Sequence, residues 1–362
     1  MKKRIFVIIL SFLLFIFLYL IFGLWGLVEI NRYNDFVFKN KEDLNFHKNY
    51  SDKMHHLRDV NKWVGKNEYL YSKIYFNKKS AKTILLQGDS WIEDISKNEI
   101  SNNFLKTFGK KNNYNIFNAG ITSFAPSTIH SQYKILKSEF SIKPDILVIY
   151  IDQTDIGDEY CRYQHNKVYT KNGKFSHVNR EKFTRATYDY SKSYLFSELS
   201  LNNNLFKILK FPYLKSNYFF KRNLNLLNQI LVKGFKNRNV SKCGFQEIMK
   251  ELISYNKDAE KVFKKSLEEL IKFLSNESLE RVILVSFPHI NHHKNIYKVN
   301  VSDYIDEVLQ RENLKFIKHL NMNKLNFRNV NIDKIYRQGD LGSHLNDEFH
   351  QKLFIKNIVS NL

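Results

Sequence analysis

Four short apolar runs, each separated from the next by a longer segment, constrain the fold of this chain more than any other feature. The runs occupy residues 83–87, 115–118, 146–151 and 281–287. Each has the length of a strand, and each is a nearly continuous apolar run rather than an alternating one. Strands of this kind belong to parallel sheets that are covered on both faces. A fifth strand is predicted at 327–332.

Helical patterns fill much of the chain between and after these strands. They are predicted at about 93–108, 126–140, 245–274, 304–310 and 346–359, from apolar spacing and a helix-opening proline. Strands that alternate with helices predict a doubly wound α/β sandwich. The alternation pauses between about 160 and 245, which we interpret as an insertion over one edge of the sheet.

The N-terminus predicts a membrane anchor. Met1-Lys2-Lys3-Arg4 is basic, and residues 5–28 are almost wholly apolar and carry no basic residue. That run is long enough to cross a bilayer as one helix. A cleaved signal peptide would have a shorter apolar region that ends at small residues, whereas this run ends in Leu-Val-Glu-Ile-Asn-Arg. We therefore expect an uncleaved signal anchor with a cytoplasmic N-terminus.

This anchor divides the chain into three predicted parts. Residues 1–30 form the cytoplasmic tip and the transmembrane helix, and 31–80 form a neck or lead-in segment. Residues 81–362 form the main domain, which is expected outside the cytoplasm, in the periplasm or at the cell surface.

The charge and the cysteines leave more than one interpretation open. The formal net charge is +21, and a basic surface attracts nucleic acid, anionic lipid or acidic polysaccharide. The lysines are scattered and no nucleic-acid-binding motif accompanies them, so nucleic acid is not an expected partner. Cys161 and Cys243 form either one disulfide of an exported domain or two thiols.

Residues that follow the strands can carry out acyl transfer. Ser90, after the first strand, can supply a nucleophilic hydroxyl, His344 the base that takes its proton, and Asp340 the carboxylate that orients the base. The backbone N–H groups of Ser90 and Gly120 can stabilise the oxyanion. Ser90 could instead merely cap a helix, but His344 in its own late block favours catalysis.

Four blocks in this order resemble the SGNH or GDSL hydrolases. They are "GDSW" with the nucleophile, "NAGITS" with the glycine donor, "PDILVIYIDQTD" at a strand end, and "DLGSHLN" with the late Asp and His. The resemblance spans residues 83 to about 350. It implies a three-layer α/β/α sandwich with a mainly parallel, flavodoxin-like sheet. It also implies Ser–His–Asp catalysis without a metal or organic cofactor.

Two positions depart from the family pattern. The third block usually carries Asn before Asp, whereas this chain has Thr154 before Asp155. A threonine hydroxyl also donates a hydrogen bond, so both residues are candidates for oxyanion or substrate binding. The family usually places Asp three residues before His, and Asp340 lies four before His344. A one-residue bulge would absorb the difference; otherwise Asp333 or a Ser–His dyad would serve.

Two further polar clusters each have two interpretations. The first is either a cation site or sugar clamp, or, as we predict, a set of loop carboxylates paired with Lys and Arg162; its members are Asp152, Asp155, Asp158 and Glu159. The second is either a metal site or, as we predict, part of a solvent-exposed loop; its members are His289, His292 and His293.

The sequence thus predicts a membrane-anchored SGNH-type serine esterase or O-acyltransferase. An anchored extracytoplasmic member resembles those that add or remove O-acetyl groups on cell-surface polysaccharide. The expected partners are the membrane and an acylated carbohydrate or lipid. The alternatives are a lipase or lysophospholipase, and a non-catalytic polysaccharide-binding or assembly factor that keeps the fold.

Overall fold

The computed structural model describes residues 8–17, 38, 40–58, 66–80, 82–180, 256–297, 299–312, 316–324, 331–337, 339–340 and 343–362. Two compact units are distinguished. The unit that contains the sheet comprises Asn49–Arg58, Asn67–Lys182 and Cys243–Leu362, and the rest of the chain forms the second unit. Every candidate site residue lies in the unit that contains the sheet.

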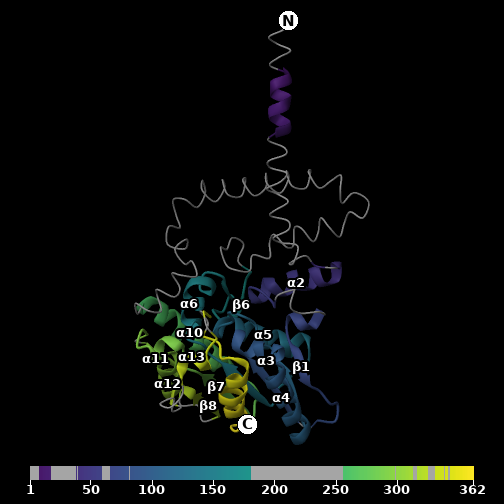
Figure 1. Ribbon diagram of the computed structural model, residues 1–362. Coiled ribbons are helices and arrows are strands. Elements are labelled where there is room, and N and C mark those ends of the chain that lie inside the picture. Colours follow the sequence, from purple (N-terminus) through teal and green to yellow (C-terminus); the bar gives the residue numbers. More distant parts are fainter. Residues whose placement is uncertain are drawn as a thin grey trace. The chain divides into compact units, whose positions relative to one another are not determined.

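Six strands form one sheet, and Figure 1 labels β1, β7 and β8 among them. Their spatial order is β1 (Ser72–Tyr75), β3 (Tyr114–Asn118), β2 (Lys82–Gln87), β4 (Ile146–Tyr150), β7 (Arg281–Ser286) and β8 (Ile317–Asn321). All neighbouring pairs are parallel except β1 with β3, which is antiparallel. The strands β2, β3, β4 and β7 lie at the four apolar runs and confirm the strands predicted there. The prediction of a mainly parallel sheet is confirmed as well.

The strand β2 lies inside the sheet, and the chain changes direction around it. After β2 the chain forms β3 on one side, and it then crosses over to form β4 on the other side. In open α/β sheets, ligands bind outside the carboxyl ends of the strands at such a switch point. Residues 88–90 follow β2 directly, so the fold places the Gly-Asp-Ser block at this point.

The longer helices fall into two groups. In the first, α10 (Lys257–Leu274) packs against both α5 (Pro126–Glu139) and α12 (Val301–Glu312). In the second, α4 (Glu99–Asn112) packs against α3 (Ser90–Lys97) and the C-terminal helical segment. That segment consists of α14 (Asp347–Phe349), the π-helical η6 (His350–Ile355) and α15 (Lys356–Val359).

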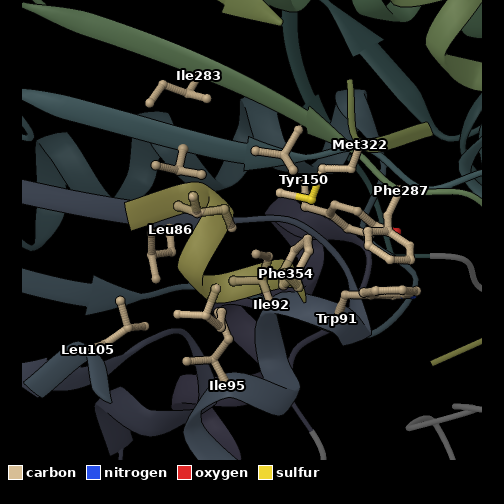
Figure 2. Close-up of a cluster of buried hydrophobic side chains, with 14 of the residues drawn as sticks. Leu86, Trp91, Ile92, Ile95, Leu105, Tyr150, Ile283, Phe287, Met322 and Phe354 are labelled. Carbon is tan, nitrogen blue, oxygen red and sulfur yellow. The ribbon is translucent and has the colours of Figure 1, made fainter. Parts of the chain in front are cut away.

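Alternate residues of the central strands face opposite helix groups. Leu86 and Val148 belong to an apolar cluster with α3, α4 and the C-terminal segment (Figure 2). Leu85 and Leu147 are equally buried, and strand alternation turns them toward the other face. Because both faces are covered, these strands are apolar throughout, and the unit has the three layers of an α/β/α sandwich.

The helix predicted at 93–108 is in fact two helices, because Asn98 interrupts it. Its N–H closes α3 by donating to the carbonyl of Asp94, and its backbone is extended. Its side chain then accepts the N–H of Ser101 at 3.0 Å and caps α4. Asparagine is among the best N-cap residues, so one side chain ends one helix and starts the next.

The fifth parallel strand is β8, not the segment 327–332. Residues 325–330 lie outside the described residues, and Ile332 begins the short helix α13 (Ile332–Ile335). The strand β8 is at an edge, where it pairs with β7 alone. It reads Ile-Lys-His-Leu-Asn and therefore lacks the apolar run that marks the inner strands.

Part of the predicted neck folds with the sheet. Strand β1 pairs with β3, although it lies within 31–80. The other described elements between residues 31 and 80 are α2 (Lys41–Met54) and η2 (Lys66–Tyr69). The described part of the predicted insertion contains η3 (Glu159–Tyr163) and a pair of strands, β5 (Lys167–Tyr169) and β6 (Phe175–Val178). Residues 181–255 lie outside the described residues, Cys243 among them, while Cys161 is disulfide-bonded.

The predicted anchor falls mostly outside the described residues. Of residues 1–30, only 8–17 are described, and they are helical and exposed. Within the part of the chain that the structure describes, no helix combines the length and the apolar character needed to cross a membrane.

Candidate active site

Ser90 stands where strand β2 turns into helix α3. Gly88 has a φ of +149°, and a Cβ there would lie 2.8 Å from Cγ1 of Ile92, so this position requires glycine. Asp89 then caps α3 by accepting the N–H of Trp91 at 2.9 Å. Ser90 is therefore the first helical residue, and its own N–H lies in the turn where helical geometry supplies no acceptor.

Ser90, His344 and Asp340 form one hydrogen-bonded chain. The Nε2 atom of His344 lies 2.6 Å from Oγ of Ser90, although 254 positions separate the two residues. The Nδ1 atom of His344 lies 2.5 Å from Oδ2 of Asp340. Ser343, between them in the loop, has a φ of +55°, and this local turn accommodates the four-residue spacing. The structure thus brings together the three residues that the sequence singles out for acyl transfer.

The electrostatics of His344 suit a general base. Burial acts to lower the pKa of His344, but the hydrogen bond and the charge of Asp340 outweigh it, so the net pKa is raised above 6.5. Because Nδ1–H is donated to the carboxylate, the neutral ring presents the lone pair of Nε2 to the hydroxyl of Ser90. This arrangement can accept the serine proton.

A second Ser–His–Asp chain exists in the same protein, and burial distinguishes it from the first. The Nε2 atom of His319 lies 2.9 Å from Oγ of Ser286, and its Nδ1 atom lies 2.5 Å from Asp306. Ser286 is fully buried, and burial lowers the pKa of His319 in spite of Asp306. Ser90 is partly exposed. Of these two hydroxyl groups, only that of Ser90 can meet a substrate.

Trp91 fixes the nucleophile against the core. Its ring centroid lies 5.2 Å from that of Phe287 and 5.4 Å from that of Phe354, in the cluster that Figure 2 shows. The ring of His344 lies 5.9 Å from it on the site side. A fully buried indole has little freedom, so the same apolar wall positions both Ser90 and His344.

The predicted role of Gly120 as an oxyanion donor is not supported. Its N–H donates to the side-chain oxygen of Asn118 at 2.8 Å. A Cβ at Gly120 would lie 2.2 Å from the backbone nitrogen of Glu93. Glycine is required here because the loop packs directly on α3, and its amide is already engaged.

Another amide of the same loop has no such partner. Between residues 119 and 124, every backbone N–H except that of Ser123 donates a hydrogen bond. The donating residues are Ala119, Gly120, Ile121, Thr122 and Phe124. Among the described residues no acceptor lies within reach of the Ser123 N–H. Ser123 is partly exposed and has a φ of +65°. No sequence pattern points to this residue, because the engaged amides depend on partners from elsewhere in the chain.

Thr154 and Asp155 are engaged within their own turn. The hydroxyl of Thr154 donates to Asp152 at 2.5 Å. Asp155 is fully buried, and its Oδ2 accepts the N–H of Asp152 at 3.0 Å. Burial, followed by the charges of Asp89 and Asp152, raises the pKa of Asp155. Neither side chain takes part in the Ser90–His344 hydrogen bond, and their role in substrate binding stays a prediction.

Two members of the acidic group have the basic partners that the sequence indicates. Asp158 pairs with Arg162 at 3.0 Å, and Glu159 pairs with Lys167 at 2.9 Å. These carboxylates are buried rather than exposed on a loop. Burial raises the pKa of Asp158 to about 6 in spite of Arg162. The pairing indicates a structural role for this part of the group.

The three histidines at 289–293 do not form a solvent-exposed loop. They lie around the short helix α11 (Ile290–His293), and His289 is buried. His292 and His293 bond to the backbone carbonyl of Val299 and the hydroxyl of Tyr336. Among the described residues, no group of three or more His, Cys, Asp or Glu side chains is arranged to hold a metal ion.

Two of the sequence blocks meet at the same end of the sheet. The "GDSW" block ends the central strand β2, and the "DLGSHLN" block brings its histidine to the same strand end. The mainly parallel sheet and the positions of these blocks agree with the SGNH/GDSL resemblance of the sequence.

Neither a protein-family model nor a curated protein matches the chain. Among solved structures, the chain is similar to LAE5, an α/β hydrolase enzyme from the metagenome of Lake Arreo, Spain. The identity is 10% and the TM-score 0.36, over 78% of this chain and 94% of that one. It is also similar to Axe2, an acetylxylan esterase from Geobacillus stearothermophilus, with 10% identity and a TM-score of 0.35 over 77% and 94%. It is similar as well to a protein of the G-D-S-L family from Desulfitobacterium hafniense DCB-2. The identity is 10% and the TM-score 0.35, over 78% of this chain and 99% of that one. At these values the likenesses do not by themselves define a function for this chain.

Proposed function

We propose that the chain is a serine esterase, or an O-acyltransferase that works through the same acyl-enzyme. The hydrogen-bonded chain of Ser90, His344 and Asp340 at the switch point of the sheet carries this proposal. His344 takes the proton of Ser90 as its oxygen attacks the ester carbonyl, while Asp340 stabilises the imidazolium. His344 then protonates the leaving alcohol, and water or a second hydroxyl releases the acyl group.

We assign the oxyanion to the amides of Ser90 and Ser123. The amide of Ser90 lies at a helix N-terminus, where the partial positive charge favours an anion. The amide of Ser123 has no acceptor among the described residues, and Ile121 ties its loop to the carbonyl of Gly88 at 3.0 Å, next to the nucleophile. Thr154 can join them only if its hydroxyl leaves Asp152.

The proposed substrate is an O-acetyl ester of a cell-surface polysaccharide. The support is the apolar run at 5–28 with its basic flank, which would hold the sheet-bearing unit close to a membrane. A lysophospholipid ester is the competing substrate, because an anchor of this kind serves a lipase equally well.

A substrate comparison tests this proposal. The purified chain is given acetylated oligosaccharide and lysophospholipid in parallel, with acetate and fatty acid release measured, and with Ser90→Ala as the blank. We expect Ser90-dependent acetate release, and label transfer from an acetyl donor to glycan would identify a transferase. Fatty acid release alone would establish the lipase. If p-nitrophenyl acetate is also left intact, the chain is a binding factor rather than an enzyme.

We also propose that the protein spans the membrane once, with the N-terminus in the cytoplasm and the sheet-bearing unit outside. Lys2, Lys3 and Arg4 precede the apolar run, and basic residues favour the cytoplasmic side. Protease added to intact cells or spheroplasts is expected to digest the sheet-bearing unit. Complete protection in cells that remain sealed would place that unit in the cytoplasm.

A further inference from the structure

The loop that contains Ser123 is held by side chains that come before the sheet in sequence. Arg58, which is buried, donates from Nε to the carbonyl of Gly120 and from Nη2 to that of Asn118, both at 2.8 Å. Its Nη1 donates to the carbonyl of Glu68 at 3.1 Å. A planar guanidinium with several donors can bind separate carbonyls at fixed angles. Arg58 therefore sets the position of the first half of the loop.

The second half of the loop is held from two sides. Glu93 of α3 accepts both the N–H and the hydroxyl of Thr122 at 2.7 Å. Burial acts to raise the pKa of Glu93, but Lys97 and Arg58 outweigh it and lower that pKa to about 2. Glu93 is thus a permanent acceptor. The hydroxyl of Tyr163 donates to the carbonyl of Ser123 at 2.5 Å.

His56 acts on the peptide unit that carries the Ser123 amide. Its Nε2 lies 2.8 Å from the carbonyl oxygen of Thr122, and the N–H of that same peptide group belongs to Ser123. A carbonyl only accepts, so Nε2 carries the proton and donates. The Nδ1 atom then accepts from Nδ1 of His55 at 2.9 Å. Burial lowers the pKa of His56 to about 3, so the ring stays neutral at the pH values at which esterases are measured.

A hydrogen bond to a carbonyl strengthens the N–H of the same peptide as a donor, because polar groups in a chain polarise one another. We propose that His56 and Arg58 are positioning residues: Arg58 holds the start of the loop, and His56 polarises the Thr122–Ser123 peptide, so that its N–H meets the oxyanion. This inference rests on the proposed function of Ser90 and Ser123. Neither side chain contacts the substrate in this arrangement.

The test compares His56→Leu with His56→Gln, whose side-chain amide can still donate toward Thr122. We measure kcat and KM for p-nitrophenyl acetate, the Kd of phenylboronic acid, which forms a tetrahedral adduct with the serine, and thermal unfolding. The leucine variant should lose about tenfold in kcat, the effect of one hydrogen bond on a transition state. KM should change little, the boronic acid should bind about tenfold more weakly, and glutamine should restore most of the loss.

His130→Leu is the matched control. His130 is also a buried histidine whose pKa is lowered to about 3 by burial, and its ring stacks on that of Phe273 at 4.2 Å. It should keep its kcat and its affinity for the boronic acid. An unchanged kcat in His56→Leu, or an equal loss in His130→Leu, would overturn the inference.

Arg58→Lys gives an independent reading should His56→Leu not fold. A lysine keeps the charge but cannot bind three carbonyls at once, so kcat should fall with KM little changed. Its control is Arg281→Lys, because Arg281 donates to the carbonyls of Asn361 and Leu362 at the other end of β7. Equal kcat in both variants would contradict the role of Arg58. Hydrolysis that persists in Ser90→Ala would instead contradict the proposed function itself.

Discussion

Replacing Ser90 with alanine is expected to lower the rate of ester hydrolysis by about 10⁶-fold, the scale of nucleophile loss in serine hydrolases with a triad. The hydroxyl that lies 2.6 Å from Nε2 of His344 is then absent, so no acyl-enzyme can form. Initial rates with p-nitrophenyl acetate measure the loss. Thermal unfolding should change little, since Ser90 is partly exposed.

The second Ser–His–Asp chain provides the matched control. Ser286→Ala removes a hydroxyl that lies 2.9 Å from the Nε2 of another histidine, His319. Because Ser286 is buried, its loss should reduce the free energy of unfolding by about 1 kcal/mol and leave the activity per folded molecule unchanged. If Ser286→Ala abolishes hydrolysis and Ser90→Ala does not, the nucleophile is Ser286 and the assignment of Ser90 is wrong.

Asp340→Asn is expected to lower kcat by about 10⁴-fold at neutral pH, because the amide no longer holds His344 in the tautomer that accepts the serine proton. The bond it removes is the 2.5 Å contact between Asp340 and Nδ1 of His344. Asp306→Asn, at the equivalent position of the buried chain, should leave kcat unchanged. A Ser–His dyad would predict only a small loss in Asp340→Asn.

The pH dependence of the same variant follows from the pKa of His344. The histidine must be neutral to act as a base, so activity should be lost as the pH falls through its pKa. That pKa is raised above 6.5, because Asp340 outweighs burial, and the acid limb of kcat/KM should therefore lie above pH 6.5. In Asp340→Asn the two effects of Asp340 are lost, and burial is opposed only by the smaller effects of Asp94 and Asp152, so the residual activity should have an acid limb at lower pH. If the acid limb of Asp340→Asn lies at the same pH as that of the unmodified protein, Asp340 does not raise the pKa of His344.

Site residues that stand in a local sequence pattern could be predicted, and residues whose role depends on tertiary contacts could not. Ser90 could be identified because an apolar run ends at Gly88, and His344 because it stands in its own late block. The engagement of the Gly120 amide could not be predicted, because the side chain of Asn118 accepts it only in the folded loop, and no sequence pattern reports such a partner. Likewise, Asn98 divides a helix through a cap that serves two neighbours at once.

Arg58 illustrates the same limit for the segment before the sheet. An arginine in a stretch without helical or strand periodicity is usually a solvated surface residue. Here its charge is buried against main-chain carbonyls. Only the folded backbone of Asn118 and Gly120 creates the need for those donors.

Strand β1 and the residues 55–58 limit how far the protein can be truncated from its N-terminal side without loss of structure or activity. A fragment that starts at residue 81 would expose the outer edge of β3, which β1 otherwise pairs. It would also strip the carbonyls of Asn118 and Gly120 of the guanidinium that satisfies them. Such a fragment would keep Ser90, Asp340 and His344 and still be a poor enzyme, so an expressed domain should begin no later than residue 49.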